Sequence, residues 1–389
     1  MFRVGSLRVD ITPSRRVFLA GFSHGRVSEG VHDRLYASIL AIGSDERCLV
    51  LVSLDLIGLF KNFIDEIRRS VADSFGVKPW EVLFCCTHTH SGPDTIGLWG
   101  SDEYTSGVDD DYMEWLRSAL SEAIIKALEN TVRGYARYSW ILVDPRGIVR
   151  NTRDRGLVDR YLSSFRFIDE SGRTIATIVN FACHPEVLSD DNKLITADYV
   201  HYLRSCIEGN IGGITVFVNG PLGGMLTPDV EARSFDEAER VGVRLARYFM
   251  DCLEYEERVE NAIIDLAYSE LTLPVDNPLF LEASRRGLLR RSIIDGRILT
   301  EVCIARIGEI SMVTIPGEAL PRIGMELRGI LDGRCKIVAC LGNDEVGYII
   351  PEDSWDPDRY EEGMSLGPST ASIIEGEVGR LVRRIRSTM

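Results

Sequence analysis

Short apolar runs alternate with amphipathic helical runs through the first 253 residues, and this alternation constrains the fold more than any other feature. The runs at 47–55 and 81–88 have the length and composition of buried strands, and the amphipathic stretches 61–76 and 110–130 have helical periodicity. The same alternation continues with a strand at 174–184, a helix at 197–208, a strand at 213–220 and a helix at 231–253. Such alternation predicts an α/β protein with a mixed, mostly parallel β-sheet flanked by helices.

The pattern changes after residue 260. Strand-like runs at 261–275 and 301–317 bracket a basic helical stretch at 281–293, and a helix at 319–331, a strand at 336–342 and a helix at 370–387 follow. Because no linker, repeat or low-complexity block interrupts the chain, we expect residues 1–389 to form a single domain. A change of sub-lobe is expected near 255–275.

Composition excludes several classes of partner. The formal charge of −15 argues against nucleic acid, whose phosphates require a basic surface. No run of 18 apolar residues occurs, so stable membrane insertion is not expected. The nine cysteines are odd in number, are scattered and form no CxxC pair, and the N-terminus shows no signal peptide. Together these features predict a cytoplasmic protein with reduced thiols, and a homo-oligomer is compatible with the sequence.

Histidines follow two of the apolar runs. His88 and His90 come after one run, and on a strand residues i and i+2 share a face, so the pair suits two metal ligands or a ligand beside a proton carrier. A hydrogen-bonded structural pair is the alternative. His184 ends a second run, where Pro185 stops the strand. Ligand sites in α/β sheets lie at such strand ends, and a catalytic zinc needs about three protein ligands.

Further oxygen ligands lie beyond other apolar runs. Glu318 and Tyr348 each follow a strand-like segment. Taken alone, Glu318 also fits a carboxylate at a helix start, and Tyr348 fits a half-buried core tyrosine.

Eleven short motifs resemble, in order, those of the neutral/alkaline ceramidase family, zinc amidases that cleave the amide of N-acylsphingosine. They cover nearly the whole chain and read LRVDITP, LAGF, GVHDRLYASIL, LVSLDLIGL, THTHSGPD, FACHPEVL, ITADYVHYL, NGPLGG, IPGEAL, LGNDEVGYI and RYEEGMSLGPST. The resemblance implies one Zn²⁺ per chain, held by His88, His184, Glu318 and Tyr348. It also implies that Tyr348 is a catalytic residue. It implies that His90 transfers a proton.

Two departures from the family pattern affect the expected chemistry. Glu345 replaces the first tyrosine of the family's Asn-x-Tyr-x-x-Tyr pattern. In the stretch GMLTPD, Thr227 replaces the serine implicated in ceramide cleavage, and its hydroxyl is the candidate catalytic group there.

Asp55 and Asp198 are expected to orient imidazoles, with a helix N-cap as the alternative role of Asp198.

The resemblance therefore predicts a zinc-dependent hydrolase that cleaves a linear N-acyl amide by metal-activated water. The substrate is expected to be a small-molecule or lipid-like N-acyl compound. The alternatives are a zinc hydrolase of a small polar amide or ester, and a metal-binding homologue without catalysis. The C-terminal β-sandwich and the export signal of longer members are not expected here. Two histidines, a glutamate and a tyrosine would also accept iron, cobalt or manganese.

Overall fold

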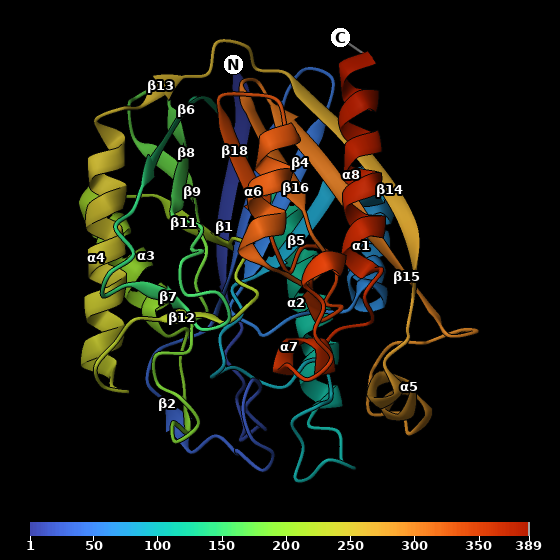
Figure 1. Cartoon of the computed structure of the whole chain (residues 1–389). Helices are drawn as coiled ribbons and strands as arrows, with labels where there is room; N and C mark the ends of the chain where they lie inside the picture. The colour runs from blue at the N-terminus through green and yellow to red at the C-terminus, as the bar shows by residue number, and fades with distance from the viewer. Residues whose placement is uncertain (388–389) are drawn as a thin grey trace.

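The apolar runs form the strands of a large curved sheet in the computed structural model, which describes residues 1–387 (Figure 1). In spatial order the sheet contains β11 (Ile214–Asn219), β9 (Thr174–Phe181), β8 (Tyr161–Asp169), β6 (Val132–Leu142), β1 (Phe2–Asp10), β3 (Tyr36–Gly43), β4 (Cys48–Leu54) and β5 (Val82–Cys86), and β13 (Glu257–Arg258) pairs with β6. A hydrogen bond of 2.5 Å from Ser53 Oγ in β4 to the Phe217 carbonyl in β11 brings the two ends of the sheet together.

The expectation of a mostly parallel sheet is wrong. Only the terminal pairs β4–β5 and β9–β11 are parallel, and every other pair of the large sheet is antiparallel. The sequence analysis did not predict the strands at 36–43, 132–142 and 161–169. Short hairpin connections, such as the one from β3 to β4, force neighbouring strands to run in opposite directions. The mixed α/β class with flanking helices is confirmed.

A second sheet lies against one face of the large sheet. It consists of β14 (Ile264–Pro274), β15 (Arg297–Ile307), β16 (Ile310–Thr314) and β18 (Cys335–Ala339). Residues of β4 show the division between the faces: Leu49 and Leu51 pack in the core shared with the second sheet, whereas Val50 and Val52 pack with the helices. This alternation follows from the two-residue period of a strand.

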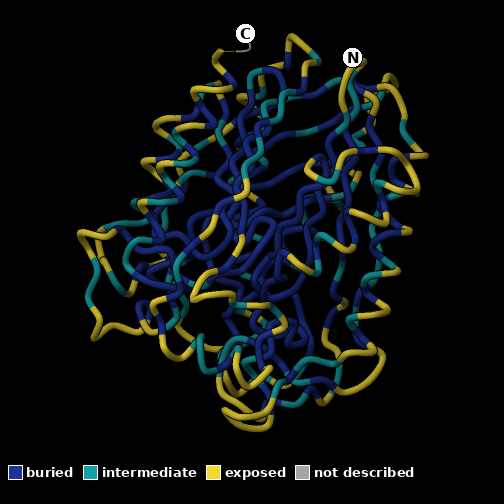
Figure 2. The backbone as a smooth tube through the Cα atoms, turned by 90° about the vertical axis from the view of Figure 1, so that its right-hand side faces the viewer, coloured by how far each residue is buried: buried dark blue, intermediate teal, exposed yellow. Residues whose placement is uncertain are grey.

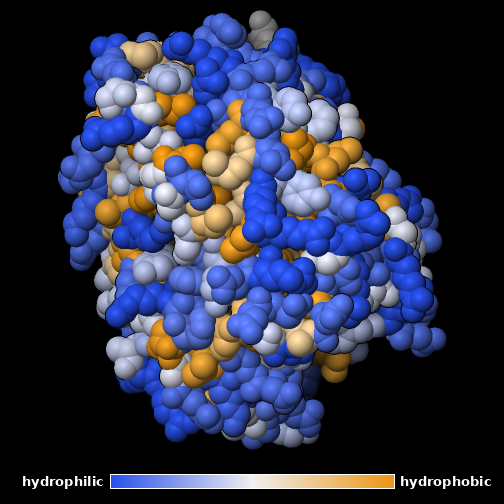
Figure 3. All heavy atoms as spheres, turned by 90° about the vertical axis from the view of Figure 1, so that its left-hand side faces the viewer, coloured by the Kyte–Doolittle hydropathy of each residue, from blue (hydrophilic) through white to orange (hydrophobic). Residues whose placement is uncertain are grey.

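Helices cover the outer faces of both sheets. Those near the large sheet are α1 (Lys61–Phe75), α2 (Asp110–Glu129), α3 (Tyr199–Ile211) and α4 (Phe235–Leu253), and those on the second sheet are α6 (Pro321–Ile330) and α8 (Thr370–Ser387). Buried backbone occupies the centre of the molecule (Figure 2), and the face that carries α4 is covered mainly by hydrophilic side chains (Figure 3). Within residues 1–387, no helix has the length and apolarity needed to cross a bilayer.

Short elements lie among the long loops. Three small sheets pair β2 (Gly30–Val31) with β10 (Leu194–Ile195), β7 (Val149–Asn151) with β12 (Leu226–Pro228), and β17 (Glu318–Ala319) with β19 (Tyr348–Ile349). The basic stretch at 281–293 is helical only at its start, in α5 (Pro278–Arg285), and α7 (Tyr360–Gly363) is a single turn. The single-domain organisation and the boundary near 255–275 stay predictions.

Candidate active site

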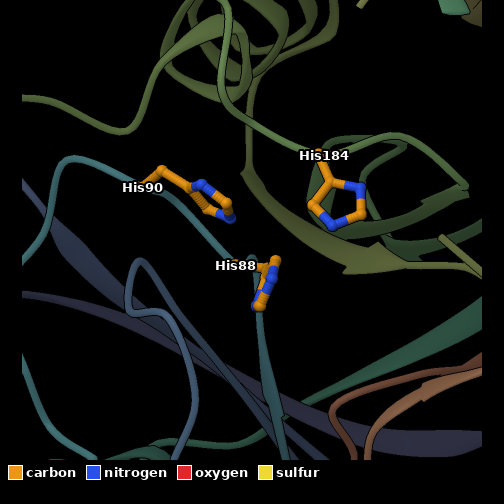
Figure 4. Close-up of side chains that lie close together, drawn as sticks. All are labelled: His88, His90 and His184. Atoms are coloured by element: carbon orange, nitrogen blue, oxygen red, sulfur yellow. The ribbon is translucent and has the colours of Figure 1, made fainter. Parts of the chain in front are cut away.

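Two loops bring three imidazoles together in the protein interior. His88 and His90 lie on the loop after β5, and His184 lies on the loop after β9 (Figure 4). Their ring centroids are 5.0 to 5.6 Å apart. One nitrogen from each ring lies within 4.8 Å of the others, and all three residues are buried. This cluster could hold a metal ion.

The prediction that His88 and His90 share one face of a strand is wrong, although the two imidazoles do lie close together. The strand β5 ends at Cys86, before either histidine. His88 has a φ of 71°, a left-handed backbone conformation that is uncommon for a residue with a side chain. Such strain persists only where the surrounding structure enforces it, and it concentrates at functional sites.

Asn219, at the end of β11, ties the two histidine loops to each other. Its side-chain Nδ2 donates to the backbone carbonyls of Thr87 at 2.9 Å and of Cys183 at 3.0 Å. Its side-chain Oδ1 accepts from the backbone amide of Cys183 at 3.2 Å. Each of these bonds ends one residue before a histidine. Sequence reasoning missed Asn219, and the available signal was a polar side chain at the end of an apolar strand.

Backbone carbonyls set the orientation of two imidazoles. Nδ1 of His88 lies 2.6 Å from the Ile57 carbonyl, and Nδ1 of His184 lies 3.1 Å from the Leu226 carbonyl. Because a carbonyl only accepts, Nδ1 carries a proton in both rings, which leaves Nε2 as the nitrogen that faces Glu318. The Nε2 atoms lie 3.5 Å (His88) and 3.0 Å (His184) from the two separate oxygens of Glu318.

Glu318 and Tyr348 reach the cluster from one small parallel sheet, where they are directly paired between β17 and β19. Both side chains are buried. The Tyr348 hydroxyl lies 3.2 Å from the sulfur of Met225. Burial and the negative charge of Glu318 raise the pKa of Tyr348 well above its usual value.

The protonation states of the cluster differ among its members. Burial lowers the pKa of His88 to about 4, and burial together with the neighbouring imidazoles lowers the pKa of His90 well below its usual value. Burial opposes the charged form of His184 too, but its bond to Glu318 and the nearby carboxylates raise its pKa. Burial alone would raise the pKa of Glu318, and the imidazoles lower it instead.

His90 has unused hydrogen-bonding capacity. Both of its ring nitrogens are buried without a hydrogen-bond partner among residues 1–387. The Glu186 carboxylate is 3.4 Å from Nδ1, a separation that does not give a hydrogen bond of acceptable geometry. Arg26 fixes the backbone by donating to the His90 carbonyl at 3.1 and 3.2 Å. The Nε2 atoms of His88 and His184, which both face the Glu318 carboxylate, fit a divalent cation that accepts imidazole and carboxylate ligands, and His90 lies beside them with its nitrogens unpaired.

The cluster lies at one side of a largely apolar pocket that encloses about 740 Å³, including open solvent at its mouth. His88, His90, Glu318 and Tyr348 line the pocket. The other lining residues are mostly hydrophobic and include Ile57, Phe60, Ile96, Leu98, Trp99, Phe280, Leu289, Ile293, Ile298, Val346, Met364 and Leu366.

Three other residues singled out from the sequence lie elsewhere. Thr227 is buried in β12 and is not among the residues that line this pocket; its catalytic role stays a prediction. The expectation that Asp55 orients an imidazole is wrong, because its carboxylate forms two bonds of 2.8 and 2.7 Å with Arg204. Asp198 instead takes the alternative role, since its side chain accepts from the Tyr199 amide at the start of α3.

The fold and the site define a mixed α/β protein with a buried histidine cluster suited to a metal ion. A family model described as "Neutral/alkaline non-lysosomal ceramidase, N-terminal" matches residues 2–219, more than half of the chain, and the chain belongs to this family. The matched range contains the three histidines, whereas Glu318 and Tyr348 lie beyond it.

Curated sequence relatives resemble part of this chain, and solved structures share its fold. Neutral ceramidase B of Dictyostelium discoideum is 26% identical over 239 residues, and neutral ceramidase of Drosophila melanogaster is 23% identical over 234 residues. These matches cover 57% and 53% of this chain but only 33% and 32% of the relatives. The crystal structure of neutral ceramidase from Pseudomonas aeruginosa superposes with a TM-score of 0.85 at 19% identity, over 100% of this chain and 75% of that one. A structure of a ceramidase complexed with C2 gives a TM-score of 0.85 at 18% identity, over 100% and 76% of the two chains.

Proposed function

We propose that this protein is a zinc-dependent hydrolase of a linear N-acyl amide with an apolar acyl chain. The observation that carries the proposal is the meeting of two oriented Nε2 atoms with both oxygens of Glu318 beside an apolar pocket. The membership of the ceramidase family supports amide hydrolysis. The apolar lining favours a lipid-like acyl group over the small polar amide or ester considered as an alternative.

The proposed ligands are His88, His184 and Glu318, with Tyr348 as a fourth group. A zinc ion bound there supplies a Lewis acid that polarises a carbonyl and lowers the pKa of water to about 7. The carbonyl bonds to Nδ1 hold the imidazoles in the ligating tautomer, and the apolar walls exclude bulk water from the scissile amide. Each of these features positions the reaction before the substrate arrives.

His90 and Tyr348 have separate roles in the proposal. The neutral His90 ring, which has no competing hydrogen bond, takes a proton from the attacking water and passes that proton to the leaving amine, a contribution of about 10²–10⁴-fold for a well-placed group. The Tyr348 hydroxyl, held beside Glu318, donates a hydrogen bond to the carbonyl oxygen as negative charge develops on it. The cytoplasm is the proposed location, on the strength of the odd, unpaired cysteine pattern.

Metal content and amide hydrolysis together test the proposal. We would measure zinc by mass spectrometry in wild type, His184→Ala and Glu318→Gln, with His201→Ala as a control histidine outside the cluster. About one zinc per chain is expected in wild type and in the control, and a clear loss is expected in the two site variants while the circular dichroism spectrum is unchanged.

Hydrolysis is then measured on N-acyl amides whose acyl chains lengthen from 2 to about 12 carbons, with kcat/KM rising along the series because each added methylene buries more apolar surface. Zinc without turnover would indicate the non-catalytic homologue. Protein that takes up no zinc when it is supplied would refute the ligand assignment.

A further inference from the structure

The pocket wall contains an acidic residue where the family pattern has a tyrosine. Glu345 lies on the loop between β18 and β19, lines the same pocket as the histidines and is 9% exposed. A carboxyl group in such an apolar wall is costly unless its oxygens are hydrogen-bonded. The partners of Glu345 therefore show what the pocket is built to receive.

One oxygen of Glu345 is satisfied and the other is not. Oε1 accepts a hydrogen bond of 2.8 Å from the Gly347 amide. Oε2 is buried and has no hydrogen-bond partner within the described part of the chain, residues 1–387. Native proteins pair nearly all buried polar atoms, so an unpaired oxygen on a side chain that lines a pocket indicates a ligand group that completes it.

The nearby arginine does not satisfy this oxygen. The Arg291 guanidinium also lines the pocket, but it bonds both oxygens of Asp344 at 3.1 and 3.0 Å and the backbone carbonyls of Glu345 and Leu299. Its charge is thus committed to Asp344, and the Glu345 side chain is left to a partner that enters from the pocket.

Close packing holds the Glu345 carboxyl in place. A Cβ atom on Gly58 would come within 2.9 Å of Glu345 Cγ and 3.2 Å of Oε2, so the backbone at Gly58 lies directly against the side chain. The Gly58 carbonyl in turn accepts a bond of 2.6 Å from the Thr95 hydroxyl. A side chain confined in this way holds Oε2 in a defined position, as a specificity-determining group must.

We propose that Glu345 selects substrates that carry a hydroxyl group, by hydrogen bonding that hydroxyl through Oε2 within the apolar pocket. A hydroxyl both donates and accepts, so it pairs with the carboxylate and with the carboxylic acid alike. The proposal rests on the proposed function, in that the pocket is taken to bind the substrate beside the metal ligands. A substrate without the hydroxyl leaves Oε2 unpaired and loses affinity.

A pair of non-hydrolysable probes tests the inference on the metal-loaded protein. 2-(Octyloxy)ethanol carries the hydroxyl, and 1-methoxy-2-(octyloxy)ethane has the same chain with that hydroxyl capped by a methyl group. Calorimetry should show that wild type binds the hydroxyl probe about 10-fold more tightly, the usual effect of leaving a buried polar group unpaired. The preference should fall to about 1-fold in Glu345→Leu and persist in part in Glu345→Gln, which retains an oxygen acceptor.

The exposed Glu352→Gln is the matched control and should keep the wild-type preference. Equal affinity of wild type for both probes, no binding of the hydroxyl probe, or an unchanged preference in Glu345→Leu would overturn the proposal. Because the probes are ethers, their binding does not depend on turnover. A retained hydroxyl preference in a protein that hydrolyses no amide would refute the proposed function alone, whereas amide turnover with equal probe affinities would refute this inference alone.

Discussion

Replacing Gly21 by alanine should displace the His90 ring. Gly21 has a φ of 101°, and a Cβ atom built on it would lie 2.4 Å from Cγ and 2.6 Å from Nδ1 of His90. The ring has little freedom to retreat, because Arg26 holds its backbone carbonyl and Phe22 packs against it with a centroid separation of 4.8 Å. Only glycine therefore allows the imidazole to occupy its observed position.

The magnitude follows from the overlap. Ordinary contact begins at 3.4 Å, so the ring must move by about 1 Å. A shift of that size at a catalytic group lowers activity by about 10²-fold. Stability falls as well, since a strained backbone costs about 1–3 kcal/mol and overpacking costs a further 1–3 kcal/mol or so.

Gly25→Ala separates the two contributions. Gly25 lies on the same loop with a φ of 77°, but its nearest neighbour would be the Ser101 carbonyl oxygen at 3.6 Å. The control thus carries the backbone strain without the clash. Urea unfolding of both variants should place Gly21→Ala about 1–3 kcal/mol below Gly25→Ala, and kcat/KM on an N-octanoyl amide should fall only in Gly21→Ala. Equal stability and equal activity of the two variants would refute the reasoning.

Three further predictions concern the metal and two buried charges. Chelation should lower the melting temperature of zinc-loaded protein, because free zinc at 100 times its Kd stabilises the folded state by about 2.7 kcal/mol. A melting temperature, measured by scanning fluorimetry, that neither chelator nor zinc changes would contradict a bound metal. Asp55→Ala should cost about 3–5 kcal/mol in urea unfolding, because it leaves the buried Arg204 guanidinium without its carboxylate, and adding Arg204→Leu should recover part of this loss. Burial, followed by the nearby Glu326, raises the pKa of Glu375 to about 7. The stabilising contribution of Glu375 is thus complete below about pH 4.5 and is lost as pH rises through 7. Between pH 5 and 8 the free energy of unfolding of wild type should fall by about 1 kcal/mol relative to that of Glu375→Gln, after solvent screening is allowed for. Parallel curves of stability against pH for the two proteins would show that the pKa shift is absent.

The sequence alone determined the class of the fold and the main candidates for the site. Apolar runs and amphipathic periodicity located helices such as α1 and α8 closely, because hydrophobic patterning is a local property of the chain. Histidines placed just after two apolar runs indicated a shared site, and His88, His90 and His184 do meet. The motifs pointed to Glu318 and Tyr348, which the structure brings to the same cluster.

Only the tertiary structure decided how these groups meet. Strand direction depends on hairpin connections and on strands that the sequence analysis did not predict, such as the partly exposed β6, so the mostly parallel sheet could not be corrected from the sequence. The role of Asp55 depended on Arg204, 149 residues away, which claims its carboxylate. Contacts between distant segments likewise explain how Asn219 links the two histidine loops and how Gly21 approaches His90. They also explain why one oxygen of Glu345 is buried without a partner. Composition and spacing describe neighbours along the chain, whereas a site is made by neighbours in space.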